Sequence, residues 1–240
     1  MPFPDPPPDW GNDEISKFID HARGNEFATF ANLKDEAAYL IEIDLLFRVA
    51  VDALNHSKDW FAGFFVLRAH SNFLAACRLV WSGQIPETYE LLRSCLENAL
   101  YCLYLAKNPD SRETWLRRHD NEDTKKAVRA EFKIGTLLDL ASAVAPAEGP
   151  IARKLYDRSI DYGAHPNERA LMQSLKIIEG VEQIKFQVIY QEHDSVQLRF
   201  ALKTTAEFGI CALSLIQGAY QERFAILGMA DELTKLKKGK

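Results

Sequence analysis

Apolar residues recur at every third or fourth position along most of the chain, which is the spacing of side chains on one face of an α-helix. This pattern predicts helices over residues 13–24, 32–55, 58–82, 86–107, 111–119, 124–144, 151–162 and about 195–228. The segment 86–107 differs from most of the others because it is apolar on nearly all sides. We expect such a helix to lie at the centre of the fold.

Residues that favour helix ends support several of these boundaries. Asn32 can cap the second helix, and Gly83 can end the third. Pro86 suits the first turn of the fourth helix, which should end before Pro109.

Near residues 173–190 the period of the pattern changes from helical to alternating. Apolar residues from Leu175 to Tyr190 alternate with Lys and Gln on either side of Gly180. Alternation of this kind is typical of β-strands, and glycine suits the turn between them. We therefore predict a mainly α-helical single domain, a bundle of about seven to eight helices with one β-hairpin near residues 173–190.

No linker or change of composition divides the chain into separate domains. Residues 1–11 are rich in proline and should form an extended lead-in. Residues 12–232 should form the helical domain and 233–240 a basic tail, of which we expect 235–240 to be frayed.

Composition and charge exclude several classes of protein. The chain has 240 residues, 47% of them hydrophobic and 26% charged, with a net charge of −5. This balance provides no global attraction to nucleic acid or to an anionic membrane, and no DNA-binding signature is present. The apolar runs are too short to cross a bilayer, and no signal peptide is recognisable. We therefore expect a cytoplasmic protein without a membrane partner.

Common catalytic and metal-binding motifs are missing from the sequence. It contains no phosphate-binding loop, dinucleotide-binding glycine motif, serine-hydrolase elbow or zinc-protease motif. The six histidines have no helical pair spacing, and the four cysteines lie in apolar stretches without a C-x-x-C motif. We therefore predict neither a cofactor nor a metal ion.

Two groups of polar residues remain as candidates for a site. The helix predicted over 151–162 carries Arg158, ends at Gly163 and is followed by His165 in front of a proline. Tyr162 and Asn167 flank this turn. In the helix over 86–107, a stripe at helical spacing carries the charged and amide side chains Arg93, Glu97 and Asn98, together with Tyr101.

The first group resembles the active-site motif of the HEPN superfamily, compact helical proteins of which many are metal-independent endoribonucleases. In that family an Arg and a His are separated by four to six residues, and six residues separate Arg158 from His165 here. Ser159 departs from the Asn, Asp or His that often follows the family's Arg. A second pair, Arg112 and His119, has the same spacing but lies in another context.

A wider pattern is similar to an uncharacterised family of bacterial helical proteins. It consists of Arg-Ser-Cys-Leu-Glu-Asn-Ala-Leu-Tyr at residues 93–101, Asn108-Pro109, Trp115 and Gly-Ala-His-Pro-Asn at residues 163–167. This resemblance implies a helical fold but no established activity.

The HEPN resemblance implies RNA cleavage without a metal ion, as in a toxin or defence protein, with two motifs meeting across a homodimer. His165 would move the proton of a ribose 2′-hydroxyl, and Arg158 would stabilise charge on the phosphate. The alternative is a dimerising binding or regulatory module in which the Gly-Ala-His-Pro turn is structural. A third possibility is a small-ligand pocket lined by Arg93, Glu97 and Tyr101.

Overall fold

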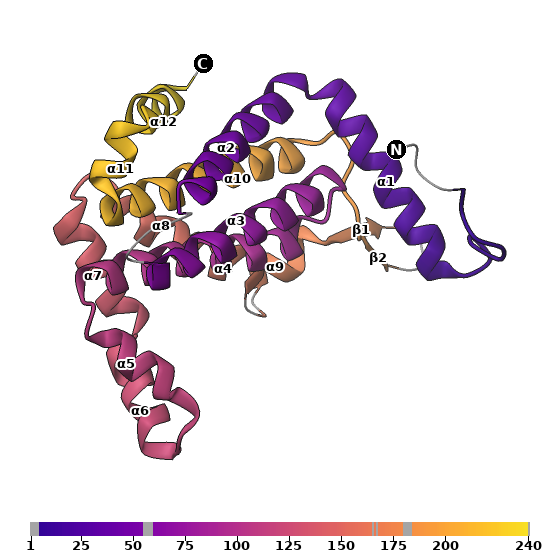
Figure 1. Cartoon of the computed structure of the whole chain (residues 1–240). Coiled ribbons are helices and arrows are strands. Elements are labelled where there is room, and N and C mark those ends of the chain that lie inside the picture. The colour runs from indigo at the N-terminus through magenta and orange to yellow at the C-terminus, as the bar shows by residue number, and fades with distance from the viewer. Residues whose placement is uncertain (1–4, 55–59, 165, 167, 180–183, 240) are drawn as a thin grey trace.

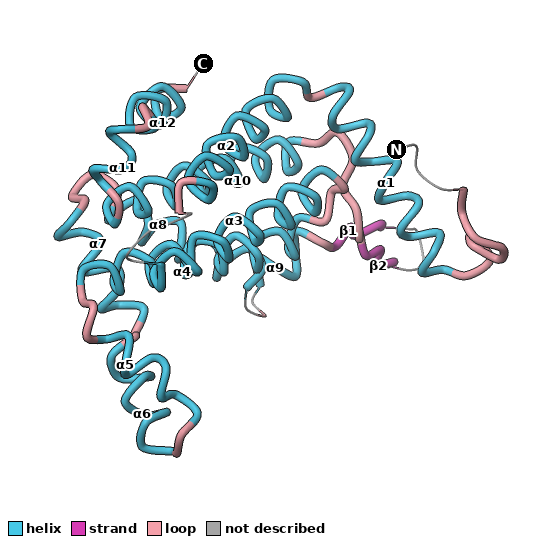
Figure 2. The backbone as a smooth tube through the Cα atoms, in the orientation of Figure 1, coloured by secondary structure: helices cyan, strands magenta, loops and turns pink. Residues whose placement is uncertain are grey.

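A computed structural model of the whole chain describes residues 5–54, 60–164, 166, 168–179 and 184–239. It is mainly α-helical and has a single two-stranded hairpin within these ranges, which confirms the predicted fold class (Figures 1 and 2). None of the described helices is long and apolar enough to cross a lipid bilayer.

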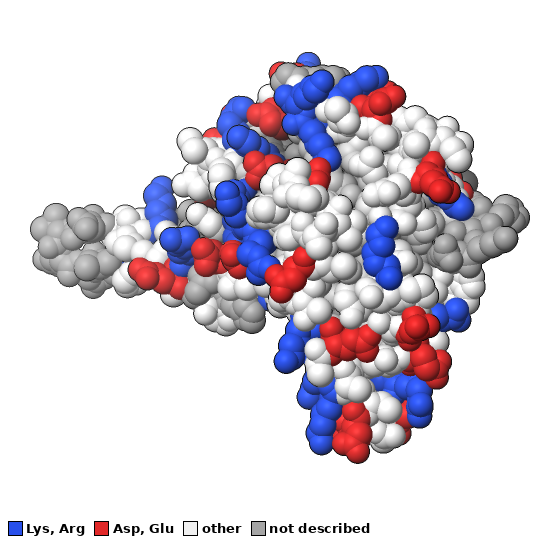
Figure 3. Space-filling model, turned by 90° about the vertical axis from the view of Figure 1, so that its left-hand side faces the viewer, with Lys and Arg blue, Asp and Glu red and all other residues white. Residues whose placement is uncertain are grey.

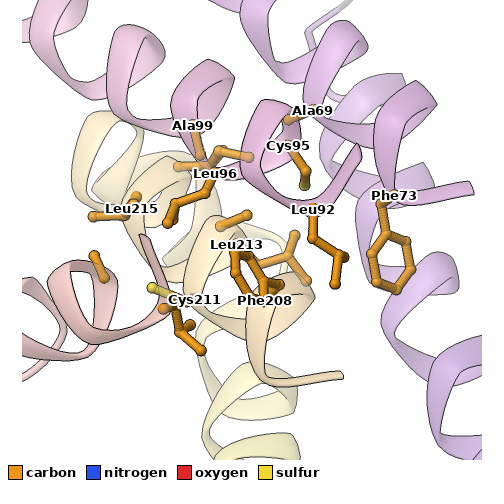
Figure 4. Packing of buried hydrophobic residues seen from close by; sticks show 14 of the residues in the cluster. Ala69, Phe73, Leu92, Cys95, Leu96, Ala99, Phe208, Cys211, Leu213 and Leu215 are labelled. Carbon is orange, nitrogen blue, oxygen red and sulfur yellow. The ribbon is translucent and has the colours of Figure 1, made fainter. Parts of the chain in front are cut away.

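Four long helices form the bundle: α2 (Lys34–Asp52), α3 (Trp60–Trp81), α4 (Ile85–Lys107) and α10 (Val196–Ala219). Helix α4 packs extensively against α3 and α10, and α2 contacts both α3 and α10. In α4, Leu92, Cys95 and Leu96 are completely buried, and they meet residues of α3 and α10 (Figure 4). The central position predicted for the 86–107 segment is therefore confirmed.

The helix predicted over 124–144 is divided into α6 (Glu122–Glu131) and α7 (Ile134–Val144). Asn121 caps α6 through a capping box with Thr124, and Lys133 adopts an extended conformation that ends the helical path. Together with α5 (Ser111–Leu116) and the 3₁₀ turn Arg117–His119, helix α6 forms the lobe at the bottom of Figure 1.

Helix α1 (Glu14–Asn32) is longer than predicted and continues past Gly24. Asp13 caps its N-terminus, and the Thr29 hydroxyl donates a hydrogen bond to the Trp81 carbonyl. Because this contact holds the second half of α1 against α3, the helix does not end at the glycine. Asn32 is therefore the last residue of α1 and does not cap α2.

The C-terminal segment differs from the prediction. Helix α10 stops at Ala219 and is followed by α11 (Gln221–Ile226) and α12 (Met229–Lys238). The expectation of a frayed end from residue 235 is wrong for residues 235–238, which belong to α12. Leu233 and Leu236 are buried, and Lys237 forms a 2.6 Å ion pair with Glu148. Two buried leucines one turn apart anchor an otherwise polar helix.

The predicted hairpin is confirmed as β1 (Leu175–Glu179) and β2 (Ile184–Val188), with Ile177 opposite Phe186 in antiparallel register. A short helix, α9 (Glu168–Gln173), precedes it and was not predicted. The residues after β2 contact α1: the Gln191 amide donates to the Phe18 carbonyl at 3.1 Å, and the rings of Tyr190 and Phe18 meet edge to face.

Candidate functional site

Arg158 lies in the last turn of α8 (Gly149–Ser159), and Ile160–Ala164 continue the chain as one wider π-helical turn. Gly163 in this turn packs directly on α4, where a Cβ atom would collide with the Pro86 carbonyl oxygen. Glycine alone permits so close an approach of two backbones, so the turn is attached to α4 at this point. His165 and Asn167, the next candidate residues, lie outside the described residues.

The guanidinium of Arg158 is held by side chains of α10. Its Nη1 atom lies 2.6 Å from Oε2 of Glu207 and 3.3 Å from Oγ1 of Thr204. The guanidinium also lies over the ring of Phe200, 5.5 Å from the ring centre. Arg158 therefore links the end of α8 to three turns of α10 through an ion pair, a hydrogen bond and a cation–π contact.

Aromatic residues extend this cluster towards α4. The ring of Tyr162 stacks on that of Tyr89 at 5.5 Å and lies 6.3 Å from that of Phe200. Burial raises the pKa of Tyr89 to about 12, although its hydrogen bond with Thr204 and the charge of Arg158 both act to lower it. The structure thus brings two of the predicted residues, Arg158 and Tyr162, to the same cluster.

We expect Tyr89 to make the stability of the protein depend on pH in alkaline solution. The unfolded chain releases the phenolic proton near pH 10, whereas the folded protein holds it up to about pH 12. The contribution of this group is therefore complete below about pH 10 and is lost as the pH rises through about 12. Urea unfolding at several alkaline pH values should show a shallower loss of stability in Tyr89→Phe than in the wild type. Identical slopes would contradict this assignment.

The polar stripe of α4 forms a second cluster. Arg93 donates from Nε to Glu97 Oε1 at 2.9 Å and from Nη2 to the Tyr156 hydroxyl at 2.8 Å. Its guanidinium also lies 5.0 Å from the centre of the Tyr156 ring. Because Tyr156 belongs to α8, these contacts connect α4 to α8. Arg93 and Glu97 therefore have a structural role.

The other two members of the stripe point to different partners. The Asn98 amide donates to the backbone carbonyl of Ser94 in its own helix at 2.7 Å. The Tyr101 ring is stacked against both Phe65 and Phe132, at 5.5 and 5.1 Å. Among the contacts of the described residues, Asn98 and Tyr101 therefore have partners other than Arg93, Glu97 and Tyr156.

Charges elsewhere on the surface are largely balanced. In the lobe formed by α5 and α6, basic side chains pair with nearby acidic ones: Arg117 with Asp120, Lys125 with Glu122, and Lys126 with Asp123. On the face shown in Figure 3, acidic and basic residues are intermixed over this lobe and over the rest of the surface. This arrangement is typical of a solvated surface and not of an RNA-binding groove.

The described parts of the chain contain no group of three or more His, Cys, Asp or Glu residues that could hold a metal ion. All four cysteines are free, and burial raises the pKa of the thiols of Cys77, Cys95, Cys102 and Cys211. Thiols of this kind are poor nucleophiles, so they do not add a catalytic group.

Sequence reasoning missed the residues that hold Arg158. Thr204, Glu207 and Phe200 come from a helix more than forty residues further along the chain. They occupy positions of α10 that face α8, and only the packing of the two helices identifies them. Tyr89 was also missed, because an aromatic residue in an apolar helix has the pattern of an ordinary core residue.

No family model matches the chain, and no curated protein or solved structure is significantly similar to it.

Proposed function

We propose that the protein is a non-catalytic, dimerising helical module that binds a partner, and that Arg158 has a structural role in it. The observation that supports this proposal is the 2.6 Å ion pair between Arg158 and Glu207. An arginine that stabilises a phosphate in a transition state must direct its donors at that phosphate. Here a carboxylate already accepts from the guanidinium, and its negative charge would repel an incoming phosphate.

A cytoplasmic location is part of this proposal. None of the four cysteines forms a disulfide bond. Free and mostly buried thiols fit a reducing compartment.

The second candidate is a metal-independent endoribonuclease that uses Arg158 and His165. One observation favours it: the Arg158 side chain remains 29% exposed, next to the half-exposed ring of Phe200 and close to Tyr162. Exposed aromatic rings beside an arginine are suited to stacking of RNA bases. In this proposal His165 would exchange a proton with a ribose 2′-hydroxyl, and Arg158 would leave Glu207 to contact the phosphate.

One assay separates the two candidates. Purified wild type, Arg158→Ala and His165→Ala are incubated with mixed cellular RNA in EDTA, and Arg153→Ala serves as the control because it removes an exposed arginine from the same helix. We expect no cleavage by the wild type. Metal-independent cleavage that survives in Arg153→Ala and disappears in the other two variants would replace our proposal with the ribonuclease.

The structural role of Arg158 has its own measurement. A double-mutant cycle with Arg158→Ala and Glu207→Ala should give a favourable coupling of about 0.5 to 1 kcal/mol in the free energy of unfolding, since both side chains are partly exposed to solvent. The same cycle on the more exposed pair of Arg153 and Asp139 is the control and should give less. Equal couplings in the two cycles would argue against a special role of Arg158.

A further inference from the structure

We propose that the outer face of α2 and α3 is the surface on which a second copy of this chain docks. This surface would be the dimer interface of the proposed function, and the inference rests on that function. The face carries six large apolar side chains, each between 39% and 55% exposed: Ile41, Leu45, Val49, Phe64, Leu67 and Leu74. Monomeric proteins rarely leave such large contiguous apolar surface in water.

The six residues form two stripes at helical spacing. Ile41, Leu45 and Val49 follow one another at intervals of four along α2, and Leu67 and Leu74 are seven residues apart on α3. Residues at these intervals lie on the same side of a helix. The buried side of α2 is occupied by other residues, such as Ile43 and Phe47, so the stripes are not part of the core.

The contacts between α2 and α3 place the two stripes side by side. The His70 ring nitrogen Nε2 lies 2.6 Å from Oδ1 of Asp44, and the rings of Phe47 and Phe73 lie 5.2 Å apart. The helices run antiparallel, because Leu54, just after α2, packs against Gly63 near the start of α3, whereas Asp44, ten residues earlier on α2, meets His70, seven residues further along α3. In this register Ile41 of α2 lies at the same height as Leu74 of α3. On its own helix, each of these residues lies next to the residues that contact the other helix, on the side away from the core. The stripes therefore lie on the same outer side of the bundle, where Ile41 is next to α3 and Leu45 and Val49 border α12 at the far edge of α2.

Charge complementarity indicates that a second copy is the occupant. Helix α2 carries five acidic residues and only two basic ones, whereas α3 carries Arg68 and Arg78 and no acidic residue. Glu36, Asp44 and Arg78 already form ion pairs within the chain. With these pairs set aside, acidic residues still outnumber basic ones on α2, and Arg68 remains on α3. A two-fold axis running along the seam between the helices would lay α2 of each copy on α3 of the other. That arrangement matches an acidic helix with a basic one twice, as an isologous interface requires.

The size of the face is also adequate. Helices of 19 and 22 residues are about 28 and 33 Å long, and two packed helices are about 20 Å across. The face is thus on the order of 600 Å², and neighbouring residues can extend it towards the roughly 800 Å² per partner of a stable interface.

This interface would not build a composite site from Arg158. Helix α8, which carries Arg158, packs on α4 and α10, the two bundle helices that do not form the proposed face. Docking through α2 and α3 therefore leaves each Arg158 cluster within its own copy of the chain.

The experiment uses a charge pair that restores the proposed contact. Sedimentation equilibrium of the full chain should show a dimer for the wild type, and at least a tenfold weaker dissociation constant for Ile41→Glu alone and for Leu74→Lys alone. In the proposed arrangement, a heterodimer of these two variants has one Glu–Lys contact and one native contact, so mixing them should restore dimers. The control Ile226→Glu changes a highly exposed residue of α11 and should remain dimeric, and circular dichroism should show that all variants are folded.

Each result has a defined meaning. A wild-type dimer that both single variants leave intact would overturn the α2–α3 surface but keep the dimerising module. Weakening by both variants without recovery on mixing would overturn the pairing of α2 with α3. A wild type that is monomeric at all concentrations would overturn the dimer of the proposed function as well.

Discussion

Replacing Leu96 with alanine is expected to lower the free energy of unfolding by about 2 to 5 kcal/mol, the range for a buried leucine that leaves a cavity. Leu96 is completely buried in α4, where α3 and α10 both pack against the helix. Neighbouring side chains are held by three helices, so they can fill only part of the space left behind. Urea unfolding followed by circular dichroism measures the loss, and Leu100→Ala, at a second buried position of α4, should behave in the same way.

The control for this prediction is Leu116→Ala. Leu116 lies at the end of α5 and is 48% exposed, so the same atoms are removed but much less apolar surface returns to water. We expect a loss below about 1 kcal/mol. A loss of that small size at Leu96 would instead show that α4 is not the centre of the core.

The long helices could be predicted because burial imposes its period on the sequence. In α4 the core positions Leu92, Leu96 and Leu100 recur at intervals of four. No glycine or proline stands between them. The short helices α9, α11 and α12 were not predicted from the sequence. A helix of six to ten residues is marginal by itself and forms because it is docked, as Leu233 docks α12.

For the candidate site, the sequence predicted residues that are close together in the chain but not their partners from other helices. The sequence indicates that Arg158 and Tyr162 lie near a helix end, because Gly163 provides a local signal. It does not indicate that Glu207 meets Arg158, since many charged residues on α10 could have done so. The partner of a charged side chain is decided by the rotation of two helices against each other, and this information is spread over the whole core.

Replacing Gly83 with alanine is expected to cost more than about 2 kcal/mol of the free energy of unfolding. Gly83 ends α3 with a φ angle of +82°, a conformation that costs other residues roughly 1 to 2 kcal/mol. Its N–H donates to the Val80 carbonyl and that of Gln84 to the Leu79 carbonyl, which together form a Schellman motif. The Gly83 carbonyl in turn accepts from the Glu192 N–H at 2.9 Å, and a Cβ atom would collide with the Glu192 backbone. The substitution therefore strains the turn and also pushes away the segment that leads into α10.

Gly24→Ala is the matched control, because the same methyl group is added where it meets nothing. Gly24 lies within α1, and apart from the adjoining backbone of its own helix no described atom lies within 4 Å of the position that its Cβ would take. Alanine favours the helical conformation by up to about 1 kcal/mol over glycine, so this variant should be as stable as the wild type or more stable. Thermal unfolding of both variants should give shifts of opposite sign. If Gly83→Ala also raised the melting temperature, the left-handed turn after α3 and its contact with Glu192 would not be part of the folded protein. The segment that leads into α10 would then have to lie elsewhere.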